Sequence, residues 1–436
     1  MVFDRRQLKA IAAISLPAVV VNITTPLLAL TDVAIAGHMG GAVFIAAIAV
    51  GGSMFNMLYW LFGFLRMGSS GLTAQAFGAG NRRAAHVVLA RALVVALIIG
   101  LIMIALQQPL CELLLRMLDV DEPTATLARD YFAICIWGAP ASLAMFSLTG
   151  WFIGMQNTRL PMWTSLFIDA LNIVLSLTFV YGWHWKINGL AAGTLIAQWA
   201  GFLLALTLAV RRYGAVRVAL RELSEGIGRF FRINSDIFLR TLCLVAVTMW
   251  FTRAGASQGP VILAVNALLM QLFTLYSYFM DGLAFAGEAI CGRHDGAADR
   301  SSLRLAVKAI FQVGGVLAVV FTLGYFLFGE TILGVLSSDG DVLRSATEYK
   351  LWAVCIPVVG CGAFLWDGIF IGITRTRAML GSMAAATAVY FILYFLLQPR
   401  LGNHGLWIAF LAYLLTRGLV LTFVAKRRRI LQDKPR

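Results

Sequence analysis

Asp32 is the residue whose surroundings most strongly predict chemistry. It lies near the end of an apolar stretch that runs from Ile11 to Ala36. An ionisable side chain inside a membrane span costs about 2.5–3.5 kcal/mol on insertion scales, so it usually marks a pathway for protons, ions or substrate. Asp32 is therefore the first candidate for a coupling site. Thr25 and Leu28 precede it by seven and four residues, share its helical face and are expected to line the wall of a substrate cavity.

Two polar stripes occur further along the chain. Asp169, Asn172 and Ser176 follow one another at spacings of three and four residues, and Thr194 and Gln198 are four apart. Such stripes can simply form interhelical hydrogen bonds worth about 0.6–2 kcal/mol each. Combined with Asp32, however, they supply carboxylate, amide and hydroxyl oxygens, which suit a hard cation such as Na⁺ or stabilise a proton-carrying carboxylate. Both interpretations remain open from the residues alone, and Asp169 and Gln198 are also candidates for the cavity wall.

Four other acids lie in or near apolar stretches. Asp281 and Glu288 are seven residues apart and so share one face of a helix, where they line an aqueous substrate cavity or pair with Arg293. Asp367 is a further cavity candidate, whereas Asp236 is interpreted as a cap at a helix start.

Proline placement suggests a helix that can bend. Pro17 and Pro26 remove backbone donors from the first apolar helix and permit a kink there, although prolines are common in membrane helices. No metalloprotease, nucleophile-elbow or nucleotide-binding motif occurs in the sequence. The pattern therefore predicts no enzyme, no cofactor and no bound metal other than a coupling Na⁺ at Asp32, Asn172 and Thr194.

The composition requires a membrane protein. Of 436 residues, 60% are hydrophobic and 13% charged, and the mean hydropathy is +0.83. Apolar stretches near 20 residues recur throughout, each long enough to cross a bilayer as a helix. We predict an all-α integral membrane protein with twelve spans at 10–36, 44–66, 88–108, 129–154, 161–182, 188–210, 236–256, 261–287, 306–328, 349–373, 378–398 and 405–425.

Charge distribution predicts the orientation. The formal net charge is +14, but the basic residues concentrate in alternate loops and so need no nucleic-acid partner. Both termini are therefore expected to be cytoplasmic.

An internal repeat divides the chain in half. Residues 149–159 read TGWFIGMQNTR and residues 367–377 read DGIFIGITRTR, at an offset of 218 residues. The repeat predicts two pseudo-symmetric six-helix lobes, 1–210 and 236–436, joined by a cytoplasmic linker at 211–235. Asp32 corresponds to Trp250, so the acid belongs to one lobe only.

Four segments resemble the DinF-like branch of the multidrug and toxic compound extrusion (MATE) transporters: NITTPLLALTDVAIAGHMG (22–40), FLRMGSSGLTAQAFGAGN (64–81), AVNALLMQLFTLYSYFMDGLAFAGEA (264–289) and WDGIFIGITRTR (366–377). The resemblance extends through both halves. It implies two six-helix lobes around a V-shaped cleft and export of cationic or amphipathic compounds in exchange for H⁺ or Na⁺.

The resemblance also implies roles for individual residues. Asp32 matches the first-helix acid of the family, and Pro17 matches a proline implicated in bending that helix. Asn172 and Thr194 match oxygen-bearing members of an N-lobe cation site, but Ser176 stands where several relatives have a second acid. The missing charge favours H⁺ over Na⁺.

We therefore expect a monomeric, proton-coupled multidrug antiporter of the cell inner membrane, with membrane lipid as its only other partner. Two alternatives are Na⁺ coupling and a flippase for lipids or lipid-linked precursors. Arg253 and Arg417 bear on the flippase, since both facing the cavity would favour anionic headgroups.

Overall fold

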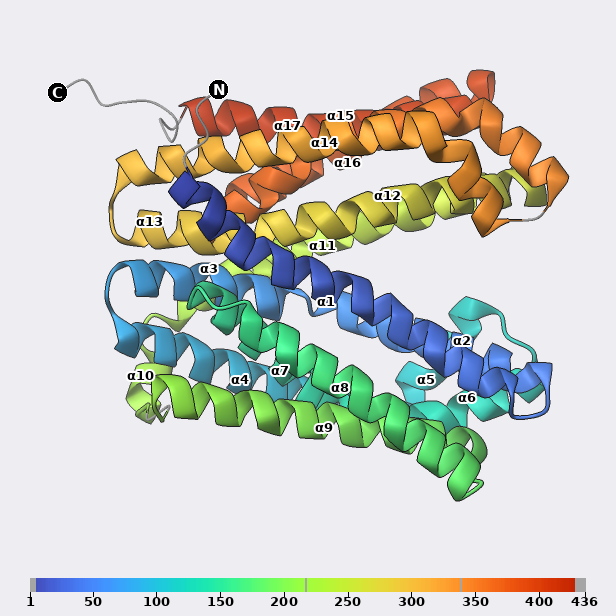
Figure 1. Cartoon of the computed structure of the whole chain (residues 1–436), viewed down its shortest axis with the longest axis horizontal. Coiled ribbons are helices and arrows are strands. Elements are labelled where there is room, and N and C mark those ends of the chain that lie inside the picture. The colour runs from blue at the N-terminus through green and yellow to red at the C-terminus, as the bar shows by residue number, and fades with distance from the viewer. Residues whose placement is uncertain (1–4, 216–217, 338, 428–436) are drawn as a thin grey trace. The chain divides into compact units, whose positions relative to one another are not determined.

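The computed structural model describes residues 5–215, 218–337 and 339–427 (Figure 1). This part of the chain is built from helices and contains no β-strand. Twelve helical segments within it are long and apolar enough to span a membrane. The predicted all-α, twelve-span fold is confirmed.

The first six spans correspond to the predicted ones but are mostly longer. They are α1 (Arg5–Gly37), α2 (Ala42–Leu61) with α3 (Phe64–Gly78), α4 (Arg82–Ala105), α6 (Glu122–Cys135) with η1 (Ile136–Gly138) and α7 (Ala139–Gly154), α8 (Arg159–Leu177) with η2 (Thr178–Gly182), and α9 (Lys186–Tyr213). A short helix, α5 (Gln107–Leu118), lies between α4 and α6.

The other six spans follow the same order. They are α11 (Ile227–Ala256), α12 (Pro260–Ala286) with η3 (Gly287–Cys291) and α13 (Gly292–Gly296), α14 (Arg300–Leu336), α15 (Gly340–Gly372), α16 (Thr376–Leu401) and α17 (Asn403–Arg427). The short helix α10 (Leu220–Ser224) precedes them.

Three predicted spans ended well before the helical segments do, at residues 66, 287 and 328. The missing segment of the second span, α3, carries Ser69, Ser70 and Thr73, which are at most 1% exposed. Small polar side chains lower the hydropathy of a segment but fit a tight interface between helices. The hydropathy pattern therefore ended the span where close packing began.

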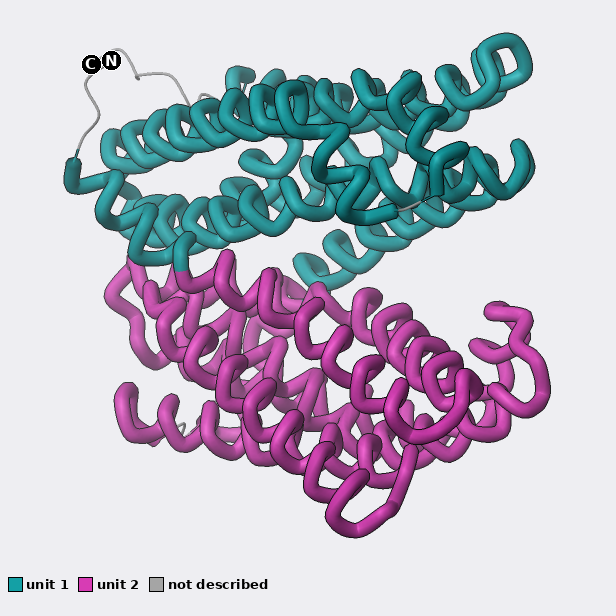
Figure 2. The backbone as a smooth tube through the Cα atoms, turned by 45° about the vertical axis from the view of Figure 1, so that its right-hand side comes forward, with its two compact units in different colours: residues 1–16, 231–436 teal, residues 17–230 magenta. Residues whose placement is uncertain are grey.

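The chain forms two compact units (Figure 2). Unit 2 comprises Pro17–Phe230, and unit 1 comprises Phe231–Arg436 together with the residues through Leu16. The division differs from the predicted lobes in assigning the first turns of α1 to unit 1. The described helix α1 is continuous through Pro17 and Pro26.

The sequence repeat is also a structural repeat. Gln156 and Thr374, which are 218 residues apart, both have positive φ, of 63° and 50°. Each is followed by the same backbone bond, from Asn157 N to Phe152 O and from Arg375 N to Phe370 O, both 2.9 Å. Because the same left-handed turn occurs at the repeat offset, the two units share the same backbone conformation at this place.

In each unit, a pair of glycines lets two helix backbones pack closely; we call this contact the GxxxG seam. A Cβ on Gly150 of α7 would lie 2.0 Å from the carbonyl oxygen of Arg66 in α3. A Cβ on Gly368 of α15 would lie 2.3 Å from the carbonyl oxygen of Ala284 in α12. The spacing of four residues to Gly154 and Gly372 makes both motifs GxxxG, which lets two helix backbones approach closely in a membrane.

The predicted linker at 211–235 is anchored to unit 2. Arg83 of α4 donates to both carboxylate oxygens of Glu222 in α10, at 2.8 and 2.5 Å. Arg91 donates to the carbonyl oxygens of Leu223 and Glu222 at 2.9 and 2.6 Å. These bonds join α10 to the α4 helix of the same unit, and the last residues of the predicted linker already belong to α11.

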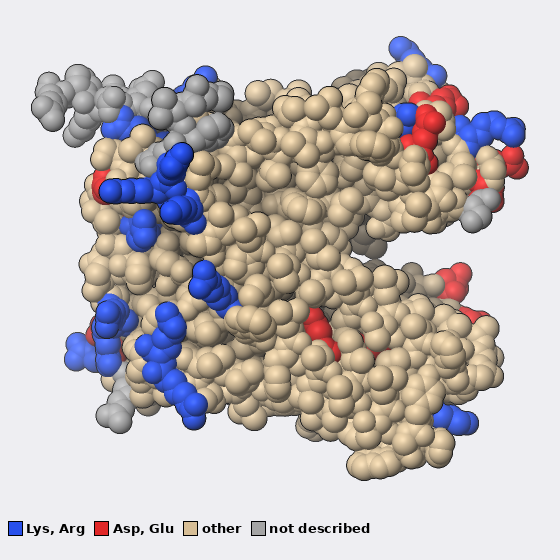
Figure 3. All heavy atoms as spheres, in the orientation of Figure 1, with Lys and Arg blue, Asp and Glu red and all other residues tan. Residues whose placement is uncertain are grey.

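Basic side chains gather near the turns that lead into α4 and α14. Arg82 and Arg83 begin α4, while Arg300 and Arg304 lie in the first turns of α14. On the face drawn in Figure 3, Lys and Arg concentrate toward the ends of the helices, and the broad middle shows few charged side chains. This distribution is typical of a membrane protein; the side on which the termini lie stays a prediction.

Candidate functional site

A hydrogen-bonded polar group joins α8 to α9 in unit 2. Asn172 Nδ2 donates to Thr194 Oγ1 at 2.9 Å, and Ser176 Oγ donates to Asn172 Oδ1 at 3.4 Å. The Thr194 hydroxyl donates in turn to the carbonyl oxygen of Leu190 at 3.1 Å. A Cβ at Gly193 would lie 2.7 Å from Ser176 Oγ, so the bare glycine allows this close approach. Three of the four predicted coupling residues are therefore brought together.

The fourth predicted residue, Asp32, lies near the end of α1. Its carboxylate is within electrostatic range of Asp169 on α8, and the Thr24 side chain of α1 lies near the Asp169 carboxylate. The Tyr181 hydroxyl donates to the carbonyl oxygen of Ile35 at 3.4 Å and so ties this end of α1 to η2. Two acids from different helices therefore face one another.

Each acid keeps one oxygen without a partner. Asp32 Oδ1 and Asp169 Oδ2 are buried and accept no hydrogen bond from the described residues. A buried carboxylate oxygen without a donor is costly, and two like charges close together in a low dielectric repel. Binding a proton or a cation at this site relieves both costs.

Tyr131 is a site residue that sequence reasoning missed. Its buried hydroxyl is within hydrogen-bonding reach of Thr194 and Cys135, and it lies within electrostatic range of Asp32. A Cβ on Gly51 of α2 would lie 2.5 Å from the Tyr131 ring, so α2 can accommodate the ring only at a glycine. The signal in the sequence was its alignment with Tyr349 at the repeat offset, which indicates a place in the fold and not a role.

Other predicted cavity residues lie apart from this group. Gln198 Oε1 is buried and has no hydrogen-bond partner among the described residues. A Cβ on Gly138 would lie 1.8 Å from this oxygen, so Gln198 packs against η1, the short turn between α6 and α7. Thr25 is exposed and donates to the carbonyl oxygen of Val21 at 3.1 Å, and Leu28 is half-buried. Their roles in substrate binding stay predictions.

Unit 1 contains a separate buried charge cluster. Asp367 Oδ2 accepts hydrogen bonds from Arg240 at 2.8 Å and Arg417 at 2.5 Å, and all three side chains are at most 12% exposed. Arg417 lies over the Tyr413 ring at 5.4 Å and within electrostatic range of Asp281. The cluster thus balances two arginines with two aspartates and connects α11, α12, α15 and α17. A cavity role for Asp367 and Asp281 stays a prediction, and the contacts favour a role in positioning helices.

One interpretation of an acid in unit 1 was wrong. Asp236 does not start a helix, because α11 begins nine residues earlier, at Ile227; it accepts a hydrogen bond from Thr376 at 2.7 Å instead. Glu288 is 1% exposed within η3, and its part in a substrate cavity stays a prediction. The backbone at Glu288 belongs to the GxxxG seam, since a Cβ on Gly372 would lie 2.5 Å from the Glu288 carbonyl oxygen.

The polar site has no counterpart in unit 1. The positions that correspond to Asp32, Asn172 and Ser176 are Trp250, Tyr390 and Tyr394. The last two rings are 6.3 Å apart, and Trp250 meets the Tyr394 ring edge-on at 5.8 Å. One repeat therefore holds paired acids and the other an aromatic cluster.

The MatE family model matches residues 17–178 and 237–396, one stretch in each half of the repeat. The chain belongs to the MATE family. MATE proteins are secondary transporters, so the chain is a transporter and not an enzyme. Its matched stretches start 220 residues apart, in keeping with the repeat.

Individual relatives agree with membership in the MATE family. DNA damage-inducible protein F of Escherichia coli K12 is 39% identical over 96% of this chain and 92% of its own length. The probable multidrug resistance protein NorM of Idiomarina loihiensis is 23% identical over 97% of this chain and 95% of its own. The Vibrio cholerae MATE transporter VcmN, solved in a bent form, superposes with a TM-score of 0.84 at 19% identity, covering 98% of this chain and 99% of that one.

Proposed function

We propose that this transporter is a proton-coupled antiporter that exports cationic or amphipathic small molecules, with Asp32 as the coupling residue. The observation that supports it best is the pair Asp32 and Asp169, each with a buried oxygen that lacks a donor. None of the described Lys and Arg residues forms an ion pair with either acid. The site therefore attracts a proton or a positively charged group.

In this proposal, exchange follows because a proton and the cationic part of the substrate compete for the Asp32 carboxylate. When Asp32 is ionised, it attracts the cationic part of a substrate; when it is protonated, that attraction is lost and the substrate is released. Antiport requires only that protonation shift the conformational balance by a few kcal/mol, which a change in one buried charge supplies. In this proposal the chemistry belongs to unit 2, because the corresponding positions of unit 1 hold Trp250, Tyr390 and Tyr394.

Bending of α1 is a second way in which protonation can act. The helix is continuous from Arg5 to Gly37 and carries Pro17 and Pro26 in its interior. Proline weakens the local hydrogen-bond ladder of a helix, so a kink at either position is accessible at modest cost. In this proposal a protonated Asp32 loses its attraction to the polar group on α8 and α9, and α1 bends.

Proton coupling is preferred to Na⁺ coupling on the ligands available. Ser176 contributes a hydroxyl where a second carboxylate would be needed at that corner, and it already donates to Asn172. Asn172 Oδ1 already accepts a hydrogen bond from Ser176, and Thr194 Oγ1 accepts one from Asn172 Nδ2. Na⁺ would therefore have to compete with these bonds for both oxygens.

The flippase alternative receives no support from the two arginines that would favour it. Arg253 is exposed and lies over the Trp250 ring at 5.6 Å, as a side chain at the membrane interface does. The charge of Arg417 is neutralised by Asp367. We further propose that the protein resides in the inner membrane with both termini in the cytoplasm, and that it acts as a monomer.

The decisive experiment is ethidium efflux from proteoliposomes under separate H⁺ and Na⁺ gradients. Asp32→Asn should abolish transport driven by the pH gradient, because the amide cannot exchange a proton. Asp130→Asn is the matched control, since Asp130 is an exposed acid on α6. Efflux by Asp32→Asn at the parent rate, or efflux that follows only the Na⁺ gradient, would refute proton coupling at this residue.

A further inference from the structure

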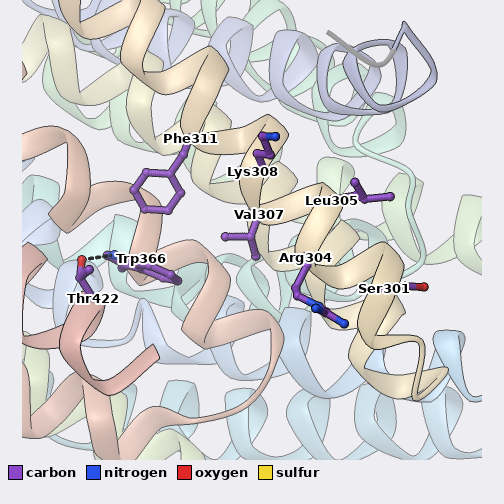
Figure 4. A pocket seen from close by; sticks show the side chains of 8 residues that line it. All are labelled: Ser301, Arg304, Leu305, Val307, Lys308, Phe311, Trp366 and Thr422. Atoms are coloured by element: carbon purple, nitrogen blue, oxygen red, sulfur yellow. Dashed lines mark hydrogen bonds between the residues drawn. The ribbon is translucent and has the colours of Figure 1, made fainter. Parts of the chain in front are cut away.

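A cavity of about 640 Å³ lies in unit 1 between α14, α15 and α17. Its lining comes from α14, with Trp366 of α15 and Thr422 of α17 (Figure 4). None of these residues belongs to the paired acids of unit 2 or to the Asp367 cluster. The proposed transport mechanism does not use this cavity.

The cavity has an apolar floor. Phe311, Val307 and Trp366 converge on it in Figure 4, and the Phe311 and Trp366 rings are 4.9 Å apart between centroids. Trp366 Nε1 donates to Thr422 Oγ1 at 2.7 Å, which fixes the indole in place. Val307 and Trp366 are 2% exposed, so half-buried Phe311 presents most of the apolar surface of the floor, a surface suited to hydrocarbon.

Apart from Leu305, the remainder of the lining is basic and polar. Arg304 and Lys308 are four residues apart on α14, one turn above the other. Ser301 lies one turn earlier, and its hydroxyl donates to Asp299 Oδ1 at 2.7 Å. Lys308 and Ser301 are exposed, and Arg304 is half-buried. Two positive charges therefore lie beside an aromatic floor.

The length of α14 sets the depth of the cavity in a membrane. The helix has 37 residues and so extends about 55 Å, against a hydrocarbon core of about 30 Å. When the excess of about 25 Å is shared between the two ends, about 12 Å lies beyond the hydrocarbon at each end. The first turns, which carry Ser301, Arg304 and Lys308, then lie in the headgroup layer, while Phe311 lies nearer the hydrocarbon. Headgroup chemistry and acyl-chain chemistry thus meet in the same cavity.

We propose that this cavity binds one anionic phospholipid, with the phosphate held by Arg304 and Lys308 and the first acyl carbons on Phe311 and Trp366. Basic pockets between transmembrane helices on the basic side of a membrane protein are suited to anionic headgroups. Two cations favour an anionic over a zwitterionic lipid, and the aromatic floor favours a lipid over free phosphate. The proposal is independent of the transported substrate and of the coupling ion.

Quenching of tryptophan fluorescence tests this proposal without any gradient or transport. The parent protein is reconstituted in phosphatidylcholine vesicles that contain phosphatidylglycerol with brominated acyl chains. The quenching assigned to the cavity is the part that disappears in Trp366→Phe. Brominated phosphatidylcholine at the same fraction should give much less quenching of this component.

Removing the two charges should weaken binding selectively. Arg304→Gln with Lys308→Gln should raise the phosphatidylglycerol fraction required for half-quenching roughly 30-fold, from the electrostatic contribution of two basic side chains. Arg232→Gln with Arg377→Gln removes two charges from exposed positions outside the lining and should behave as the parent.

Four results would overturn the proposal. Three are equal quenching by the two brominated lipids, equal weakening in the two double variants, and no Trp366 component at all; the fourth comes from a competition with phosphate. Inorganic phosphate is added in a separate series. If phosphate removes the quenching while the lipid's acyl chain contributes nothing to affinity, the cavity is a free-anion site and the lipid assignment fails.

Discussion

Replacement of Asp367 by Asn should be among the most destabilising single changes in unit 1. The wild-type cluster balances Arg240 and Arg417 against Asp367 and Asp281. Asp367→Asn leaves one guanidinium charge uncompensated in a buried position, and breaking a buried pair in this way costs about 3–5 kcal/mol. For a cooperative unit of 150–250 residues this corresponds to a Tm lower by roughly 6–20 °C.

The order of the variants tests the charge argument itself. Arg417→Gln leaves Asp367 paired with Arg240 but removes one of the two positive charges of the cluster while both aspartates stay. Because Asp281 is half-buried and water can screen its charge, we expect this change to cost less than Asp367→Asn, about 1.5–3 kcal/mol, the value of a hydrogen bond to a charged group. Combining Asp367→Asn with Arg240→Gln restores the balance between Arg417 and Asp281. The double variant should therefore be more stable than Asp367→Asn alone.

Thermal unfolding in detergent micelles, followed by tryptophan fluorescence, measures these differences. Asp341→Asn is the matched control, because Asp341 is exposed in the first turn of the same helix, α15. A Tm for Asp367→Asn equal to that of the control, or strictly additive losses in the double variant, would contradict the view that the cluster is held by charge balance.

Three further predictions concern unit 2. Replacing Asn172 and Thr194 by Val, singly and together, should reveal a coupling of about 0.6–1.7 kcal/mol in a double-mutant cycle of thermal stability, and zero coupling would mean that their bond contributes nothing. Gly150→Ala should lower the Tm sharply, because its Cβ would lie 2.0 Å from a backbone oxygen. Gly324→Ala is the control, since a Cβ there would meet nothing within 4 Å and should leave the Tm unchanged. Similar Tm values for the two variants would refute the close backbone packing at Gly150. The hydrogen bond from an arginine of α4 lowers the pKa of Glu222 to about 2, so this contact is fully formed above pH 4.5 and is lost as the pH falls through 2. Glu222→Gln should therefore leave the pH profile of efflux between pH 5 and 8 unchanged, and a shifted profile would implicate α10 in coupling.

Hydropathy and the repeat predicted the fold correctly, each for its own reason. Every span needs about 20 apolar residues, and a duplicated chain repeats its turns at one offset. What hydropathy could not show is the extension through Ser69, Ser70 and Thr73, since these residues are buried by close backbone packing and not by apolar character.

Spacing predicted contacts within a helix better than contacts between helices. The stripe of Asn172 and Ser176 follows from the helical period, and the structure joins it to Thr194. Tyr131 reaches the same group from α6, and the pairing of Asp367 with Arg240 and Arg417 joins three helices. Such contacts depend on how helices pack, and a single sequence contains no direct record of that.

The anchoring of α10 indicates where the polypeptide can be cut. Because Arg83 and Arg91 bind α10 to α4, the short helix belongs to the first fragment, and the turn at Gly226, with φ of 69°, is the natural breakpoint. Two separately expressed chains divided there would each keep their own GxxxG seam. A cut before α10 would instead separate Glu222 from its arginine. A functional split transporter is therefore expected from the later site, with a reporter or affinity label placed at the new ends.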